Sequence, residues 1–559
     1  MTYAINDGDP VSINIKAGEV IDSSTKEHLL DGSSILCMSP YMTLKSLYAN
    51  FGITTNIRDY KSIHALMLYN SEAPWSMGVI SESISERDTI DRLKAKVRAM
   101  RRVHQKYGDD FMVDHEVYLL SCRINEVGPL LDTKFASAAK MIDLSIKSDM
   151  KKKFEEVTGI DNPRSRKDFM RWLSVKTQRC VNSTSKAYLE ELMSSTDNED
   201  VKEAIDLNIS FSKTSTNKYD SLLNNARNGS RLSYAYKYYG ARTGRWSSTG
   251  AQLHNLPRTS VGNIDLTREL VLRNDTFSLD LVVGNAIDAL SSLVRTSIVA
   301  PDGCMLAAAD FSSIESIVLA WMAGAEWKLE AFRDHGMIYE AVASRMLNKD
   351  IKDISKKERN QGKVSELALG YQGGYNALVN MSKALGVNIS DSEIYASIKS
   401  WRDSNREVVN LWSAVENSAK EAIRSNGAYR SNIYSYRHNN LYIKLPSGRS
   451  LCYRNARVEA GEIIFDRYLT DKPEATYGGK LVENITQGIA RDLLAAAMLR
   501  LDSSGFKIVM HTHDEVVCEV PESCAEKSLE VMLELMIKSV NWSSGLPLKA
   551  DGFISKYYK

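Results

Sequence analysis

Small and apolar residues dominate a short run at 304–309, which ends at Asp310, and apolar residues then recur at helical spacing from 314 to 322. A run of this length is typical of a strand, and a period near 3.6 residues is typical of a helix that packs one face on a core. The pattern predicts a strand, an acid at its end and a helix. Ser312 and Glu315 have the S-x-x-E spacing of a capping box, which is the simplest role for Glu315.

A second apolar run, at 508–517, is interrupted by His513, Asp514 and Glu515. Charged side chains are almost never fully buried without a partner, so the interruption predicts two short strands that meet at a tight turn carrying both acids. One interpretation is a solvated hairpin tip. The other is a metal site that needs a second acid, for which Asp310 is the candidate, because Mg²⁺ is usually held by one or two carboxylates together with substrate phosphates.

Residues 355–374 are predicted to form a helix that opens with a capping box at Ser355 and Glu358 and closes at two glycines, 373 and 374. Four side chains lie along one side of this helix, four residues apart: Arg359, Lys363, Leu367 and Tyr371. A stripe that packs on a core would not begin with two cations. Cations at one end and an aromatic ring at the other, over about 18 Å, match a triphosphate and a base, so ligand binding is favoured over core packing.

The stretch YAYKYYGARTGRW (234–246) interleaves tyrosines and a tryptophan with basic residues. Aromatic rings stack on bases and cations hold phosphates, so this stretch is predicted to contact nucleic acid. Over the whole chain, 71 Lys and Arg residues against 70 Asp and Glu residues give a net charge of +1. This balance excludes a globally basic nucleic-acid binder but leaves room for a local basic groove.

Length and cysteine content bound the class of protein. A chain of 559 residues exceeds one ordinary core, so several domains are expected. The seven cysteines form no C-x-x-C pair, so neither a zinc site nor a disulfide framework is expected, and a reducing compartment fits. Neither a signal peptide nor a run near the ~18 apolar residues of a membrane span is visible. We expect a cytoplasmic protein that does not bind membranes.

Five segments together resemble the family A DNA polymerases, the DNA polymerase I group, and most closely the bacteriophage-type members. DFSSIE (310–315) resembles the first palm motif, R-x3-K-x3-L-x3-Y (359–371) the nucleotide-binding fingers motif, and HDE (513–515) the last palm motif. TGRWSSTGAQLHNLPR (243–258) resembles the segment that touches the primer–template minor groove, and GGKLVENITQGIARD (478–492) resembles a palm helix that contacts DNA. All five occur in the family order.

The resemblance implies an α+β fold with right-hand polymerase architecture: an antiparallel-sheet palm, a helical thumb, helical fingers and a small α/β N-terminal domain. The implied divisions are an N-terminal domain over 1–110, the thumb and the approach to the palm over 111–240, the first part of the palm over 241–345, the fingers over 346–435 and the second part of the palm over 436–559.

The resemblance further implies a DNA-dependent DNA polymerase that extends a primer 3′-hydroxyl with dNTPs by a two-metal mechanism, without proofreading. Asp310, Phe311 and Asp514 are the implied ligands of two Mg²⁺ ions. Glu515 and Lys363 complete the catalytic set. The implied nucleotide-binding residues are Arg359, Lys363, Leu367, Tyr371, Glu315 and Tyr339, and the implied DNA-binding residues are Arg245, Gln487 and His513. Primer–template DNA is the expected partner of a monomer, with accessory replication proteins also considered.

Three positions depart from the family pattern. Leu367 stands where the family commonly has an aromatic residue, Tyr339 where cellular members often have His, and Ser313 where the first palm motif has Gln. These departures concern nucleotide contacts more than metal binding.

Two other functions compete with DNA synthesis. A single-subunit RNA polymerase shares the palm acids and the Arg/Lys/Tyr helix, but Glu315, which crowds the ribose 2′-position in DNA enzymes, and TGRWSST favour DNA synthesis. A catalytically inactive binding protein on the same scaffold is disfavoured because Asp310, Asp514, Arg359 and Lys363 are all intact.

The N-terminal region is about half the length of the proofreading exonuclease that family members often carry. Residues 35–53 weakly resemble an exonuclease stretch, but Ser39 and Thr43 stand at its Asn and Asp positions. Neutral hydroxyls cannot replace carboxylates as Mg²⁺ ligands. The hypothesis is a trimmed, inactive exonuclease remnant, and the alternative is an unrelated domain.

Overall fold

The computed structural model describes residues 114–227, 230–387, 389–426, 431–467 and 472–559, and four short strands closer to the N-terminus. Those four strands are β1 (Thr2–Tyr3), β2 (Val11–Ser12), β3 (Ile35–Cys37) and β4 (Ile57–Asp59). β1 and β2 pair antiparallel, and β3 and β4 pair parallel. The predictions for Ser39, Thr43 and an exonuclease remnant lie outside the described residues.

A four-stranded antiparallel sheet in the order β15-β16-β9-β17 forms the centre of the molecule. Its strands are β9 (Cys304–Phe311), β15 (Lys507–Thr512), β16 (Glu515–Pro521) and β17 (Ala550–Ser555). The small side chains at 307–309 are fully buried, and helix α23 (Ala525–Ile537) packs directly over β9. Helix α22 (Gly478–Ser503) in turn packs on α23. Antiparallel sheet and helices together confirm the expected α+β class.

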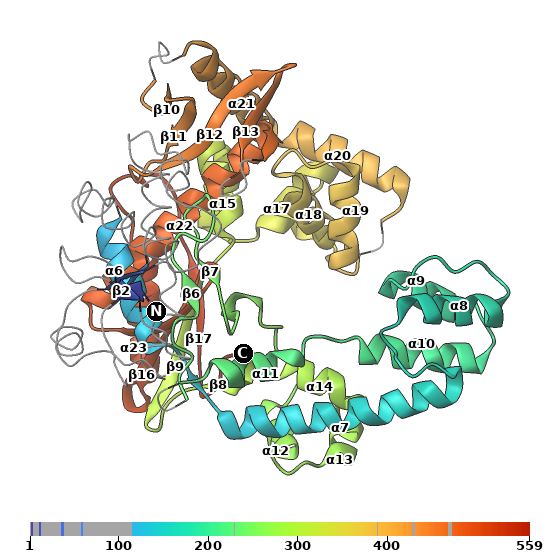
Figure 1. Ribbon diagram of the computed structural model, residues 1–559. Coiled ribbons are helices and arrows are strands. Elements are labelled where there is room, and N and C mark those ends of the chain that lie inside the picture. The colour runs from blue at the N-terminus through green and yellow to red at the C-terminus, as the bar shows by residue number, and fades with distance from the viewer. Residues whose placement is uncertain are drawn as a thin grey trace.

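A long helix leaves this centre and carries a separate lobe at its far end (Figure 1). Helix α7 (Thr133–Thr158) contributes Phe135 to the main core and Phe154 to a second, smaller apolar core. The smaller core is completed by α8 (Arg166–Thr177), α9 (Lys186–Ser194) and α10 (Glu199–Phe211), after which α11 (Asn217–Asn225) leads back. We call these helices of the smaller core the tip lobe.

Short elements join the lobe to the central sheet. They are α6 (His115–Val127), β5 (Leu130–Leu131), β6 (Tyr236–Lys237), β7 (Ser247–Ser248), α12 (Ile264–Leu272), α13 (Thr276–Val283), α14 (Ala286–Ser292) and β8 (Ile298–Val299). Single turns of 3₁₀ helix lie at Leu253–Asn255, Arg295–Ser297, Ile351–Asp353 and Glu522–Cys524.

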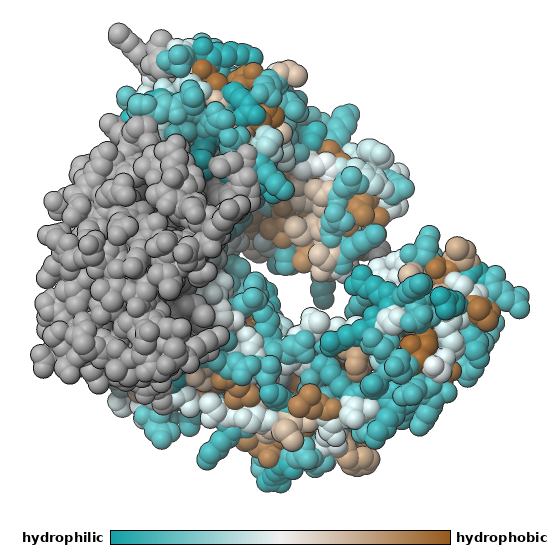
Figure 2. All heavy atoms as spheres, in the orientation of Figure 1, coloured by the Kyte–Doolittle hydropathy of each residue, from teal (hydrophilic) through white to brown (hydrophobic). Residues whose placement is uncertain are grey.

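A second group of helices stands across an opening from the tip lobe (Figures 1 and 2). It comprises α16 (Glu326–Asp334), α17 (Ile338–Leu347), α18 (Lys356–Leu369), α19 (Tyr375–Ala384) and α20 (Asp391–Ser404). Helices α15 (Ile314–Ala323) and α21 (Arg406–Arg424) connect it to the centre. A five-stranded antiparallel sheet follows α21: β10 (Tyr434–Arg437), β11 (Asn440–Lys444), β12 (Ser450–Glu459), β13 (Glu462–Asp466) and β14 (Pro473–Thr476).

Helix α18 begins as predicted but ends early. Ser355 and Glu358 form the expected capping box, whereas the helix ends at Leu369 and not at the glycine pair 373–374. A Cβ on Gly373 would lie 1.9 Å from the carbonyl oxygen of Ala368, so the chain folds back on the helix end there. The glycines therefore form the turn into α19. Among helices of the described segments, none is long and apolar enough to cross a membrane.

Candidate active site

The central sheet brings the two predicted acids together. β16 pairs antiparallel with β9, which places Glu515 opposite Asp310. His513 and Asp514 form the tight turn between β15 and β16, with His513 in the left-handed region at φ 55°. The backbone N–H of Phe311 donates to the carbonyl of Asp514 at 3.3 Å, so the turn is tied to the end of β9.

Each of these carboxyls holds its proton more tightly than an isolated carboxyl does. The pKa of Asp310 rises to about 6 because of desolvation first and then repulsion from Asp514 and Asp551, although its side chain is open to solvent on one side. Burial is also the main cause that raises the pKa of Asp514, and it raises that of Glu515 to about 7. Arg258 attracts both Asp310 and Glu515 but does not offset these effects.

The donor set fits a hard divalent cation. In the described residues no three His, Cys, Asp or Glu side chains converge as a metal cluster. Two carboxylates, Asp310 and Asp514, and the backbone beside Phe311 remain, and Mg²⁺ characteristically takes one or two protein carboxylates and completes its shell with water and phosphate. Repulsion between Asp310 and Asp514 is the kind of strain that a bound cation removes.

Arg245 spans two acids of this site. Its guanidinium lies 2.9 Å from a Glu315 oxygen and 3.3 Å from an Asp514 oxygen. Attraction to Arg245 lowers the pKa of Asp514 but is outweighed by burial. The guanidinium of Arg245 is therefore directed at Glu315 and Asp514. A primer end bound beside these acids would lie within its reach.

The capping box predicted at the start of α15 does not form. Helix α15 begins after Ser313, whose φ of 52° makes no side-chain cap. The hydroxyl of Ser312 instead donates to Asp551 of β17 at 2.6 Å. Glu315 is thereby left to pair with Arg245, so the cap interpretation of Glu315 was wrong, because a strand distant in sequence captures the serine.

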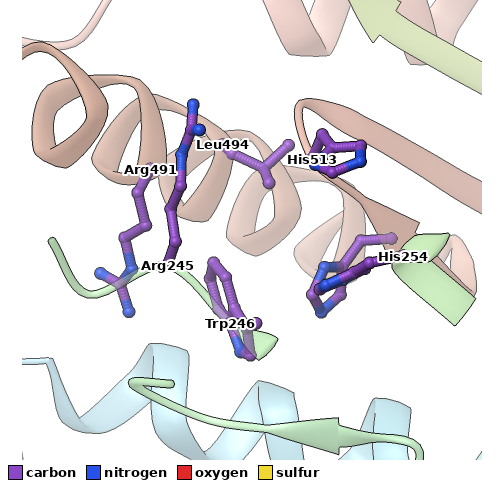
Figure 3. A pocket seen from close by; sticks show the side chains of 7 residues that line it. Arg245, Trp246, His254, Arg491, Leu494 and His513 are labelled. Atoms are coloured by element: carbon purple, nitrogen blue, oxygen red, sulfur yellow. The ribbon is translucent and has the colours of Figure 1, made fainter. Parts of the chain in front are cut away.

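A pocket opens beside the turn (Figure 3). It is lined by Arg245, Trp246, Arg491 and Leu494 together with His254, His511 and His513. Burial first, and then repulsion by His513, lowers the pKa of His254 to about 4. Burial likewise keeps the pKa of His511 well below its usual value. In the described part of the chain the Nε2 atoms of both His254 and His511 lack a hydrogen-bond partner, so the two imidazoles of the pocket wall are neutral and partly unsatisfied, beside the cationic side chains of Arg245 and Arg491.

The cationic end of α18 faces an aromatic ring. Arg359 and Lys363 lie 5.7 and 5.6 Å from the centroid of Tyr339. Arg359 also donates to Glu340 at 2.6 Å, so its guanidinium is already engaged. Leu367 is 41% exposed, which leaves it accessible to a ligand.

Tyr371 lies beyond the end of α18, in the turn that follows. Burial, followed by the charge of Glu315, raises its pKa, so this ring is enclosed close to Glu315. The helical stripe predicted from the sequence thus holds for its first three members, and Tyr371 reaches the site from the turn.

Two departures from the family pattern contact each other. Burial raises the pKa of Tyr339, and a hydrogen bond with Ser313 is the largest effect that opposes the rise. Tyr339 and Ser313, which both depart from the family pattern, are therefore joined by a hydrogen bond.

A buried ion pair anchors α18, and it was not anticipated from the sequence. Glu366 accepts from Lys328 of α16 at 2.8 Å and from the indole N–H of Trp401 of α20 at 3.0 Å. It also accepts from Ser316, the residue after Glu315. Both members of the ion pair are essentially inaccessible to solvent. Burial alone would raise the pKa of Glu366, but attraction to Lys328 and the hydrogen bonds from Lys328, Ser316 and Trp401 together lower it.

The remaining predicted DNA contact, Gln487, lies in α22 and donates weakly to Glu483 at 3.5 Å. Asp551 and Arg258 act electrostatically on Asp310 and were not predicted. Only the pairing of β17 with β9 brings Asp551 opposite Asp310, so no local pattern could have indicated it.

The chain is similar in sequence to known polymerases. The family model described as DNA polymerase family A matches residues 135–559. The DNA polymerase of Bacillus phage SP02 is 36% identical over 461 residues, which is 80% of this chain and 70% of the phage protein. A thermostable DNA polymerase I of Thermus filiformis is 27% identical over 311 residues, 55% of this chain but 30% of that longer protein.

The fold is also similar to a solved structure. The POL domain of Pol1 from M. smegmatis, determined in complex with DNA primer-template and dNTP, matches with a TM-score of 0.64 at 18% identity. The match covers 99% of this chain and 91% of that one.

Proposed function

The chain belongs to DNA polymerase family A and is a DNA-directed DNA polymerase, and from this premise we propose that it extends a primer 3′-hydroxyl with dNTPs on a DNA template, with Asp310 and Asp514 as ligands of two Mg²⁺ ions. The observation that carries the proposal is the placement of these acids by β9 and the β15–β16 turn, where both pKa values are raised. Strongly perturbed carboxyls in one site are typical of functional centres.

Asp310 and Asp514 would hold two Mg²⁺ ions, which would supply positive charge that favours an in-line displacement at the triphosphate. The protein groups position the substrate. Lys363 offers a point charge to the triphosphate, and Arg359 offers a planar fork once it leaves Glu340. Phosphoryl transfer of this kind depends on positioning and electrostatics and needs no covalent intermediate.

The sugar and base of the nucleotide are assigned to side chains farther from the triphosphate than Arg359 and Lys363. Glu315 limits the space at the ribose 2′-position, and Leu367 and Tyr339 contact the nucleotide. Tyr371 closes over the template base. The enclosure of Tyr371 beside Glu315 supports this grouping.

The primer end is assigned to the side of the site on which the pocket beside His513 opens. Arg245 reads minor-groove acceptors, which every base pair offers. His513 contacts the primer strand, and Gln487 contacts the DNA from α22. Glu515 acts beside the metal ligands, and its carboxylate accepts from the hydroxyl of Tyr558 at 2.8 Å.

The proposal keeps the divisions implied by the resemblance: it assigns α7–α11 to the thumb and palm approach (111–240), the four-stranded sheet with α22 and α23 to the palm (241–345 and 436–559), and α18–α21 to the fingers (346–435). Primer–template DNA and dNTPs are the partners, the enzyme acts as a monomer, and accessory replication proteins can join it. The phage relative supports the cytoplasm of a bacterial host as the place of action.

Primer extension by the full-length chain tests the proposal. Wild type should incorporate dNTPs in Mg²⁺, reject rNTPs and stop in EDTA. Asp310→Ala and Asp514→Ala should abolish extension but keep duplex affinity, since affinity rests on phosphate contacts. Asp502→Ala, an acid paired with Arg123 at the surface, is the matched control and should extend normally. Substantial extension by either active-site variant would refute the metal assignment, and efficient rNTP use would favour an RNA polymerase.

A second test concerns proofreading, which we propose is absent. A mismatched, end-labelled primer incubated with Mg²⁺ and no dNTPs should remain intact. Shortening from the 3′ end that persists in Asp310→Ala would reveal a separate nuclease site.

A further inference from the structure

Two arginine side chains are buried behind the turn that carries Arg245. Arg449 and Arg491 are 2% and 1% exposed. Burial of a charged group is costly unless the group is paired and hydrogen-bonded throughout, so each contact of these side chains is informative. Neither residue has a role in the proposed function.

Arg449 connects two segments that are distant in sequence. Its Nε donates to Asp492 of α22 at 2.6 Å, and its Nη1 donates to the hydroxyl of Tyr239 at 2.5 Å. Its Nη2 donates to the carbonyl of Thr243 at 2.8 Å, two residues before Arg245.

Arg491 holds the next carbonyl. Its Nε donates to the carbonyl of Gly244 at 3.0 Å, directly before Arg245. Its Nη1 forms ion pairs with Asp114 and Asp492, and its guanidinium lies 4.6 Å from the ring of Trp246, directly after Arg245. Figure 3 shows Arg491, Arg245 and Trp246 side by side at the pocket.

The turn has no room for a side chain at position 244. Gly244 has a φ of +86°, and a Cβ there would lie 2.4 Å from Nη1 of Arg449. Thr243 and Gly244 are thus each held through their carbonyl oxygens by a different buried guanidinium. The next side chain in the chain is Arg245, which points at Glu315 and Asp514.

We propose that Arg449 and Arg491 are positioning residues for Arg245: by holding the carbonyls of Thr243 and Gly244 they direct its guanidinium at the primer end. The inference rests on the proposed role of Arg245. Arginine suits the task because one planar group can donate to a carboxylate and to a carbonyl at once, which the single ammonium of lysine cannot do in the same geometry.

A double-mutant cycle tests the inference, with single-turnover incorporation of a matched dNTP in Mg²⁺ as the measurement. Arg245→Ala should slow incorporation by about ten- to a hundred-fold, and Arg491→Lys should slow it by a comparable or smaller factor, because misplacement of a contact by ~1 Å can cost ~10²-fold. The double variant Arg245→Ala/Arg491→Lys should be no slower than Arg245→Ala alone. A general loss of stability would instead multiply the two effects.

Arg268→Lys is the matched control. Arg268 is also buried, donating to the carbonyl of Thr296 at 2.5 Å and pairing with Asp132 at 2.6 Å, away from the acids. This control should lower the thermal midpoint and leave the incorporation rate of the folded protein unchanged. Arg449→Lys is measured alone and combined with Arg245→Ala in the same way. It replaces Arg491→Lys in the test if Arg491→Lys gives no folded protein.

The outcomes separate the two levels of the proposal. A wild-type rate in Arg245→Ala would overturn the role of Arg245 and the positioning role with it. A slow Arg245→Ala combined with a wild-type rate in Arg491→Lys and Arg449→Lys, or with effects that multiply in the double variants, would overturn the positioning role alone.

Discussion

The guanidinium of Arg245 and the carboxylate of Glu315 form an ion pair at 2.9 Å across the mouth of the site. Arg245 is assigned to the primer end, and Glu315 is assigned to the sugar of the incoming nucleotide. In the proposed function this ion pair therefore links the residue that selects the primer end to the residue that selects the sugar.

Glu315→Ala is expected to admit ribonucleotides. Removal of the side chain opens space at the 2′-position, and the dNTP to rNTP selectivity should fall by about ten-fold or more, in the range of a single lost steric contact. Ratios of kcat/KM for the two nucleotides measure this. Glu330→Ala, at an exposed site in α16, is the control. An unchanged ratio would reduce Glu315 to a partner of Arg245.

Lys363→Ala is expected to slow incorporation by about 10²- to 10³-fold, the usual effect of removing one electrostatic contact to developing charge. A single-turnover dNTP series separates the maximal rate from the apparent nucleotide affinity. Lys356→Ala, in the exposed first turn of the same helix, should behave as wild type. Equal rates in both variants would return α18 to a structural role.

His254 is expected to make stability depend on pH. Its pKa in the folded chain is about 4, below the ordinary 6.5. Between these values the unfolded state binds more protons, so the contribution is fully present above pH ~6.5 and is lost as the pH falls toward 4, by roughly 3 kcal/mol. Urea unfolding of wild type and His254→Gln from pH 7 to 4 should converge at low pH. The exposed His335→Gln should follow wild type, and parallel curves for His254→Gln would contradict the assignment.

Lys328→Met should destabilise the protein strongly. It leaves Glu366 charged and buried without its ion-pair partner, and breaking such a pair costs about 3–5 kcal/mol. Lys328→Met/Glu366→Gln should recover much of this loss, because Gln remains an acceptor for Trp401 without the charge. Thermal and urea midpoints measure both. Lys527→Met, which breaks an exposed pair, should show no measurable change.

Local patterns predicted the elements that depend on neighbours in the chain. The strand before Asp310, the turn at His513–Asp514 and the cap at Ser355 all follow from spacing within a few residues, and the structure confirms each as an element. Features that depend on distant pairing were missed. Ser312 does not cap α15, because its hydroxyl donates to Asp551 instead. Nothing in the sequence near Glu366 indicates that Lys328 is its ion-pair partner.

Helix α7 belongs to two apolar cores at once, with Phe135 in one and Phe154 in the other. Its middle is solvated between them, so the tip lobe shares little buried surface with the rest of the described chain. Such a lobe is a cooperative unit of its own, able to open at a lower free energy than the sheet that holds the acids. Amide hydrogen exchange should therefore divide the chain into two classes, with the lobe exchanging first while the catalytic centre remains protected.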